Sequence, residues 1–291
     1  MVNYERIGTA SYRLGEGPLW DHDNGTLYWL DLLQPGVFRY DPSSGDIDGW
    51  ELPGDVGGSM ALREKGGAVI AMDRGFHFFD FDTGTCETIV EPEPEKTDTT
   101  INDGKADRRG RFFAGSEDLS FKEPKGSLYR LDPDLSWSVV DRGFICANGP
   151  CWSPDNSIFY FADSNKHTIY AYDYDIETGE LANRRVFLDT RPYNATPDGG
   201  TIDADGYLWT TFTETGCIAR FAPDGSLDEL IETPIEMVTS LTFGGDDMDV
   251  LYVTSIGDEI DGLRPSKPDA GGIYAVTGLG AKGLPEPKFA G

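Results

Sequence analysis

The chain has 291 residues and a formal charge of −27, from 51 acidic and 24 basic side chains. This charge excludes nucleic acid and anionic membrane surfaces as expected partners, because both would be repelled, whereas a metal cation would be attracted. Apolar residues make up 38% of the chain and aromatic residues 12%, which is enough to bury a core and excludes a disordered chain.

Strand-turn-strand units recur along the whole chain. Each consists of an apolar strand, a polar turn, an alternating strand and an Asp-Pro or Thr-Gly turn, which predicts β-structure throughout. In chain order, the paired strands are expected at 25–31 with 36–42, 67–72 with 75–80, 110–115 with 126–133, 157–163 with 168–173, 206–211 with 216–221, and 249–254 with 272–276. Six copies at a spacing of roughly 40 to 50 residues match the blade length of a β-propeller.

These units predict an all-β fold, a single six-bladed β-propeller domain over residues 1–291. One four-stranded blade cannot bury both of its faces, so the blades pack face to face around an axis and close on themselves. We expect the first strand, near residues 3–10, to join the last blade. The innermost strands, which line the axial channel, are expected over 17–19, 58–62, 102–106, 148–152, 198–202 and 239–243.

Polar residues occur at the heads of several inner strands. Glu16, Asp103, Asn148 and Asp198 are each followed at once by glycine, which permits a tight turn and close backbone approach. Since the strand heads meet at the axis of the ring, residues from different blades can form one site. Carboxylate and carboxamide oxygens suit a harder divalent cation: Glu16 and Asp198 would balance its charge, and Asn148 would add a neutral ligand. The sequence therefore predicts a metal site in the central channel.

Four motifs carry a resemblance to a known family. They are Gly15-Glu16-Gly17-Pro18-Leu19-Trp20, Asn102-Asp103-Gly104-Lys105-Ala106-Asp107, Asn148-Gly149-Pro150 and Pro197-Asp198-Gly199. In this order and at blade spacing they resemble the senescence marker protein/gluconolactonase/luciferin-regenerating-enzyme family over essentially the whole chain. The resemblance implies a six-bladed propeller with an axial metal held by Glu16, Asn148 and Asp198. It also implies that Asn102 contacts substrate or metal-bound water, with Asp103 in the same turn.

Many bacterial members of that family hydrolyse aldonolactones. The resemblance therefore implies a metal-dependent lactonase, a hydrolase acting on carboxylic ester bonds, which opens a gluconolactone-like lactone or a pentonolactone to its aldonic acid. The metal would polarise the lactone carbonyl, and Asp198 would act as the general base unless hydroxide on the metal attacks directly. One divalent ion is expected, with Ca²⁺, Mn²⁺, Zn²⁺ and Fe²⁺ left open.

One position departs from the family pattern. Some animal relatives carry an arginine two residues before the Asn of NDGK, where it grips substrate hydroxyls, and this chain has Thr100 there. We expect Thr100, Asn102 and Asp103 to contact the substrate. The segment 117–123 lies where relatives form a lid, and its acidic and aromatic residues suit a polyol, although a plain surface loop is an equal interpretation.

Other chemistries find less support. No GxSxG motif is present and the three histidines form no spaced pair, which argues against a Ser-His-Asp triad. The four cysteines lack CxxC spacing, so we expect buried free thiols rather than a zinc or redox motif. Hydrolysis of other lactones, esters or organophosphates and a non-catalytic metal-binding propeller remain as alternatives.

The chain also indicates its location and partners. Residues 1–13 contain no apolar run that suits a signal peptide, and no stretch of 18 apolar residues exists, so a cytoplasmic protein is expected. The expected partner is a small-molecule sugar lactone, with no nucleic acid and no membrane. The chain is expected to be a monomer or a weak homo-oligomer.

Overall fold

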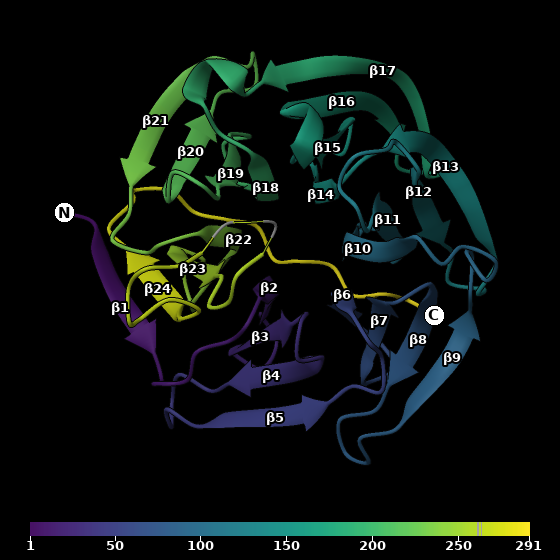
Figure 1. The fold of residues 1–291 in the computed structure, drawn as a ribbon, viewed down its shortest axis with the longest axis horizontal. Helices are drawn as coiled ribbons and strands as arrows, with labels where there is room; N and C mark the ends of the chain where they lie inside the picture. The colour runs from purple at the N-terminus through teal and green to yellow at the C-terminus, as the bar shows by residue number, and fades with distance from the viewer. Residues whose placement is uncertain (261, 263) are drawn as a thin grey trace.

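In the computed structural model, six four-stranded antiparallel sheets form a ring around a central axis (Figure 1). The structure describes residues 1–260, 262 and 264–291. The prediction of an all-β, six-bladed propeller is confirmed, and each repeated strand pair of the sequence lies at the centre of one blade.

The strands follow one another from the axis outward in each blade. Blade 1 contains β2 (Gly15–Asp21), β3 (Thr26–Asp31), β4 (Gly36–Tyr40) and β5 (Ile47–Glu51). Blade 2 contains β6 (Gly57–Leu62), β7 (Ala68–Met72), β8 (Gly75–Phe79) and β9 (Cys86–Val90). Blade 3 contains β10 (Thr99–Ala106), β11 (Phe112–Asp118), β12 (Gly126–Leu131) and β13 (Trp137–Phe144).

The second half of the ring repeats this order. Blade 4 contains β14 (Ala147–Trp152), β15 (Ile158–Asp163), β16 (Thr168–Asp175) and β17 (Glu180–Asp189). Blade 5 contains β18 (Pro197–Ile202), β19 (Leu208–Phe212), β20 (Cys217–Phe221) and β21 (Leu227–Glu232). Blade 6 contains β22 (Val238–Gly244), β23 (Val250–Ser255) and β24 (Ile273–Thr277), and its outermost strand is β1 (Asn3–Ile7).

The two ends of the chain close the ring within blade 6. β1 pairs antiparallel with β24, from Asn3 opposite Thr277 to Ile7 opposite Ile273. This confirms the expected closure by the first strand. Pairing the N-terminal strand into the last blade gives that blade its fourth strand and covers the edge of β24, so β1 becomes the outer strand of blade 6. Two short 3₁₀ turns, η1 (Ser164–Lys166) and η2 (Arg191–Tyr193), interrupt the β-structure, and no helix in the described part of the chain could cross a bilayer.

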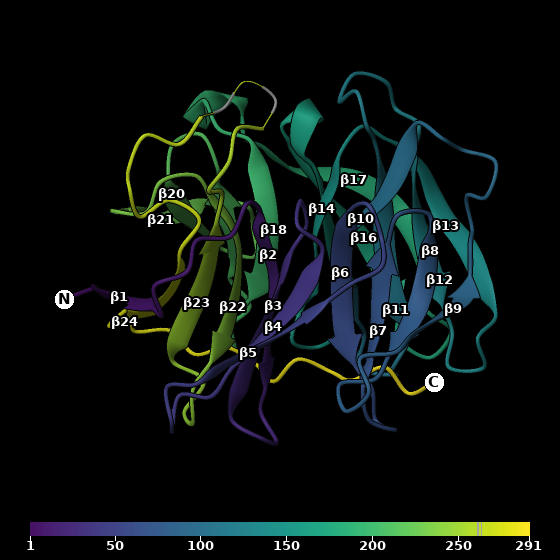
Figure 2. The same cartoon turned by 60° about the horizontal axis from the view of Figure 1, so that its bottom comes forward.

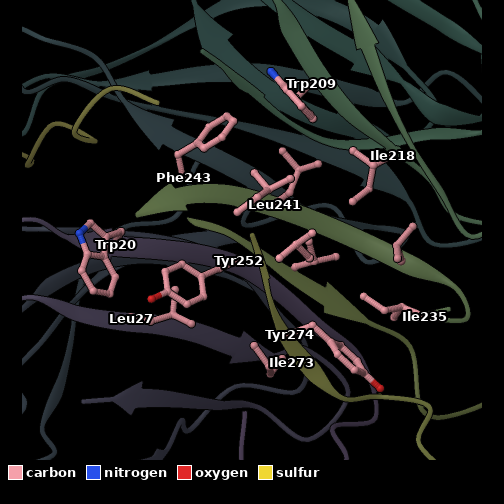
Figure 3. Packing of buried hydrophobic residues seen from close by; sticks show 14 of the residues in the cluster. Trp20, Leu27, Trp209, Ile218, Ile235, Leu241, Phe243, Tyr252, Ile273 and Tyr274 are labelled. Atoms are coloured by element: carbon pink, nitrogen blue, oxygen red, sulfur yellow. The ribbon is translucent and has the colours of Figure 1, made fainter. Parts of the chain in front are cut away.

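Aromatic side chains fill the space between blades. Trp20 of blade 1 stacks on Tyr252 of blade 6, with ring centroids 5.3 Å apart, and Trp209 of blade 5 meets Phe243 of blade 6 edge-on at 5.5 Å. Figure 3 shows these residues in one cluster with Leu241. Each such aromatic pair adds about 0.5–1.5 kcal/mol beyond the burial of apolar area. The packing between blades therefore fixes the positions of the inner strands.

The C-terminal segment crosses the end of the ring where the inner strands finish (Figures 1 and 2). Its backbone forms isolated bridges between Asp203 and Gly283 and between Arg63 and Phe289. Beneath it, the Lys105 ammonium lies 2.9 Å from the Glu286 carboxylate. This end of the channel is thus covered by the chain itself.

Candidate active site

A cavity of about 470 Å³ lies at the opposite end of the channel, where the inner strands begin. Its volume falls in the range of small-molecule sites, roughly 300–1,000 Å³. Four residues of the sequence-predicted site line it: Glu16, Asn102, Asn148 and Asp198. They come from blades 1, 3, 4 and 5, so the ring brings together side chains that are up to 182 positions apart in the chain.

Irregular strand pairing directs these side chains. The register between the first two strands shifts between Glu16 and Leu19 in blade 1 and between Asn148 and Cys151 in blade 4. A β-bulge of this kind kinks the strand and re-aims the side chains around it. The glycines that follow, Gly17 with φ 53° and Gly149 with φ 58°, adopt the left-handed conformation that glycine tolerates best.

The two candidate carboxylate ligands, Glu16, which is buried, and Asp198, which is half-buried, have no basic partner. Glu16 is 8% exposed, and burial raises its pKa well above the usual value, an effect that Asp198 and Asp103 increase. Burial likewise raises the pKa of Asp198, although the Thr213 hydroxyl donates a hydrogen bond of 3.0 Å to its Oδ2. Among the described residues, neither carboxylate forms an ion pair with Lys or Arg. Buried charges of one sign are costly unless a counter-charge is supplied, and a bound cation would supply it.

Asn148 is held in a defined orientation. Its Nδ2 donates to the Ser164 Oγ at 2.8 Å, and its Oδ1 accepts from the Asn102 Nδ2 at 3.1 Å. A carboxamide oxygen has two acceptor sites, so Oδ1 retains one for a further partner. Asn102 is anchored in turn, because its Nδ2 also donates to the Ala147 carbonyl at 3.0 Å.

These residues fit a divalent cation of the harder type. The candidate set is two carboxylates and one carboxamide, all with oxygen donors, from three separate blades. Within the described ranges, no group of three or more His, Cys, Asp or Glu side chains has a metal-binding arrangement. The set of Glu16, Asn148 and Asp198 contains a carboxamide and only two carboxylates, so it is not a group of that kind, and it stays the candidate metal centre that the sequence predicts.

The structure does not bring Thr100 and Asp103 into the cavity. The Thr100 hydroxyl donates to the Asp73 carbonyl at 2.9 Å, between blades 2 and 3. Both carboxylate oxygens of Asp103 accept backbone hydrogen bonds, from Gly104 at 2.7 Å and from Gly149 at 2.8 Å. The expectation that these two residues contact the substrate thus finds no support in their positions. Asp103 instead braces blade 3 against the bulge of blade 4.

The sequence analysis placed Glu117 only within the possible lid segment 117–123, and it did not name Thr213 or Ser164, which the cavity also contains. Glu117, at the end of β11, accepts a hydrogen bond from the Cys146 thiol at 2.9 Å, and burial raises the pKa of Glu117 to about 7. Thr213 and Ser164 lie in the cavity wall and orient Asp198 and Asn148. An acidic residue within an otherwise buried strand was the available signal for Glu117, because perturbed acids cluster at functional sites.

The segment 117–123 combines two structures. Glu117 and Asp118 belong to β11, and the following residues form the turn toward β12. Leu119 and Phe121 of this turn contribute apolar surface to the cavity, and the Asn165 Nδ2 donates to the Phe121 carbonyl at 3.1 Å. The segment is therefore part of the site and not a loop remote from it.

Comparisons with known proteins cover the full length of the chain. Residues 14–257 match the model of the SMP-30/Gluconolactonase/LRE-like region. Regucalcin of Gallus gallus is 36% identical over 297 residues, which span 100% of this chain and 99% of the relative. Pentonolactonase XacC of Haloferax volcanii is 35% identical over 287 residues, covering 97% of this chain and 96% of the relative.

Solved structures show the same architecture. A luciferin-regenerating enzyme superposes with a TM-score of 0.94 at 30% identity, covering 100% of both chains. A regucalcin from Agrobacterium tumefaciens, described as a calcium-binding protein, superposes with a TM-score of 0.91 at 26% identity over 98% of this chain and 96% of the other.

Proposed function

The chain belongs to the SMP-30/gluconolactonase/LRE-like family, and from this premise we propose that it is a metal-dependent lactonase that opens a sugar lactone, gluconolactone-like or a pentonolactone, to its aldonic acid. The Haloferax volcanii relative named pentonolactonase supports the reaction and the substrate class. The observation that carries the proposal is the convergence of Glu16, Asn148 and Asp198 on one substrate-sized cavity.

Glu16, Asn148 and Asp198 would hold one divalent cation. The calcium-binding description of the Agrobacterium tumefaciens regucalcin supports Ca²⁺. Mn²⁺ also suits oxygen donors, and Zn²⁺ and Fe²⁺ are alternatives that this all-oxygen set favours less. When bound, the cation would polarise the lactone carbonyl and stabilise the oxyanion that develops on it.

Asp198 is proposed as the general base. The hydrogen bond from Thr213 to its Oδ2 fixes the carboxylate, so that its Oδ1 can take a proton from the attacking water. Water then adds to the carbonyl carbon, the acyl C–O bond breaks, and the ring oxygen leaves and takes up the proton that Asp198 accepted, which restores the Asp198 carboxylate. The Asn102 Oδ1 would accept a hydrogen bond from a substrate hydroxyl, because the Asn102 Nδ2 already donates hydrogen bonds to Asn148 and Ala147.

Proton release from fresh aldonolactones tests this function. The assay uses purified protein before chelation, after chelation and with each divalent metal added back, and it subtracts spontaneous lactone opening. Rapid turnover that is lost on chelation and restored by one metal is the expected result. Tight metal binding without turnover of any lactone would instead identify a non-catalytic metal-binding propeller.

A further inference from the structure

The wall of the cavity carries acidic groups but no strong base. Besides the candidate metal ligands, its ionisable side chains are Glu117, Glu214, Cys146 and His167, and none of the described residues that line it is Lys or Arg. Thr100 supplies no cation either, because it is a threonine and its hydroxyl is bonded to the Asp73 carbonyl. A dication would neutralise Glu16 and Asp198, which leaves the charge of Glu117 uncompensated within the cavity.

Glu117 is built into the wall in a fixed position. It lies opposite Thr100 in the pairing of β10 with β11, and it is 9% exposed. Its Oε2 accepts from the Cys146 Sγ at 2.9 Å, and Cys146 lies within 3.5 Å of the Asn148 Nδ2. Among the described residues, no hydrogen bond or ion pair to the Glu117 Oε1 is found. One carboxylate oxygen is therefore held by the protein, and the other is left for a ligand.

We propose that Glu117 is a specificity-determining residue: its Oε1 accepts a hydrogen bond from a substrate hydroxyl, and its carboxylate disfavours lactones that carry an anionic substituent. A carboxylate forms a charge-assisted bond with a hydroxyl donor. Toward a second carboxylate or a phosphate it is repulsive, and the low dielectric of a buried wall strengthens the repulsion. The inference rests on the proposed function and narrows its substrate to a neutral polyhydroxy lactone.

A matched pair of substrates tests the proposal. Glucono-1,4-lactone and glucaro-1,4-lactone differ only in the group at C6, which is a hydroxymethyl in the first and a carboxylate in the second. The metal-loaded protein is assayed at pH 8, above the pKa of about 7 for the Glu117 carboxyl. We expect kcat/KM to be at least about 30-fold higher for the neutral lactone, since one close like-charge pair costs on the order of 2 kcal/mol in a partly buried site.

Variants at position 117 separate charge from hydrogen bonding. Glu117→Gln keeps an acceptor oxygen but removes the charge, so the preference for the neutral lactone should shrink about tenfold. Glu117→Asp keeps the charge but shortens the side chain, so KM for the neutral lactone should rise while the preference persists. Glu123→Gln, an exposed residue in the turn that follows β11, makes the same change in net charge and should leave the preference unaltered.

The outcomes distinguish this inference from the proposed function. Equal kcat/KM for both lactones in the unaltered protein would overturn the inference alone, and so would a preference that Glu117→Gln does not change. Turnover of neither lactone with any metal would overturn the proposed function and the inference with it. Metal affinity of Glu117→Gln, measured by chelator competition, should equal that of the unaltered protein, and a large loss would assign Glu117 to the metal centre instead.

Discussion

The two ends of the inner strands differ in whether their buried charged groups have a partner of opposite charge. Where the strands begin, Glu16 and Asp198 are buried beside other acids, and burial raises the pKa of both. Where they finish, the buried Lys105 is paired with Glu286 at 2.9 Å and donates to the Gly200 carbonyl at 3.1 Å. Burial alone would lower the pKa of Lys105, but Glu286 reverses this effect and the pKa is raised.

The difference shows how one repeated architecture yields a closed end and a functional end. At the closed end, the C-terminal segment supplies the counter-charge from within the chain. At the end with the candidate site, the described residues offer no Lys or Arg to Glu16 and Asp198, so a bound cation would supply the counter-charge of the proposed metal centre. Changes at the two ends should therefore have different consequences, on activity at one and on stability at the other.

The largest effect is expected at the functional end. Asp198→Ala removes a candidate ligand and the proposed base together, so kcat/KM should fall by at least about 10³-fold. Cation affinity, measured by calorimetric titration, should fall with it. Glu286→Gln, at the closed end, serves as the control and should retain kcat/KM within about twofold. Near-normal turnover in Asp198→Ala would remove the mechanism proposed above.

A substitution at the closed end should lower the stability of the fold. Glu286→Ala leaves the buried Lys105 ammonium without its partner, which should lower the free energy of unfolding by about 3 kcal/mol. Urea denaturation followed by tryptophan fluorescence measures this change. The folded fraction should keep its kcat, since Glu286 does not line the cavity. An unchanged midpoint would mean that the ion pair contributes nothing net to the closed end.

The pH dependence of the free energy of unfolding, measured on the chelated protein, tests the burial of acidic groups at the cavity. In the folded protein, burial raises the pKa of Glu117 from its usual value to about 7. The native state therefore binds a proton that the unfolded chain has released, so the free energy of unfolding should fall as pH rises through this window. Glu117 alone contributes about 2 kcal/mol between pH 5 and pH 8, and the raised pKa values of Glu16 and Asp198 act in the same direction. Saturating divalent cation should stabilise the protein more at pH 8 than at pH 5. A stability that rises over this range would contradict uncompensated burial at the functional end.

The smallest effect concerns the support of Asp198. Thr213→Val removes the hydroxyl that donates to Asp198 at 3.0 Å, so its carboxylate loses one orienting bond worth about 1 kcal/mol. We expect kcat/KM to decrease between about 3- and 10-fold. Ser43→Ala, a hydroxyl removed from an exposed turn, is the matched control. Identical kinetics in both variants would show that Thr213 has no positioning role.

The sequence alone determined the architecture. Alternating strands, turn residues and six units of similar length are local features, and together they predicted the number of blades, the closing strand and the positions of the inner strands. The glycines after Glu16 and Asn148 marked the points where the inner strands become irregular, because a left-handed backbone is readable as a residue type. These features depend on neighbouring residues and are therefore visible without a structure.

Only the tertiary structure decided that Glu117 enters the cavity and that Thr100 and Asp103 do not. Thr100 and Asp103 lie within two residues of Asn102, yet their side chains bond to Asp73 and Gly149 of adjacent blades. Glu117 enters the cavity from the second strand of the same blade. The bulge at the head of each inner strand re-aims its side chains, and the partners that satisfy them come from blades distant in sequence. Contacts between blades therefore set the direction in which these side chains point at the axis, and the spacing of residues along the sequence does not encode these contacts.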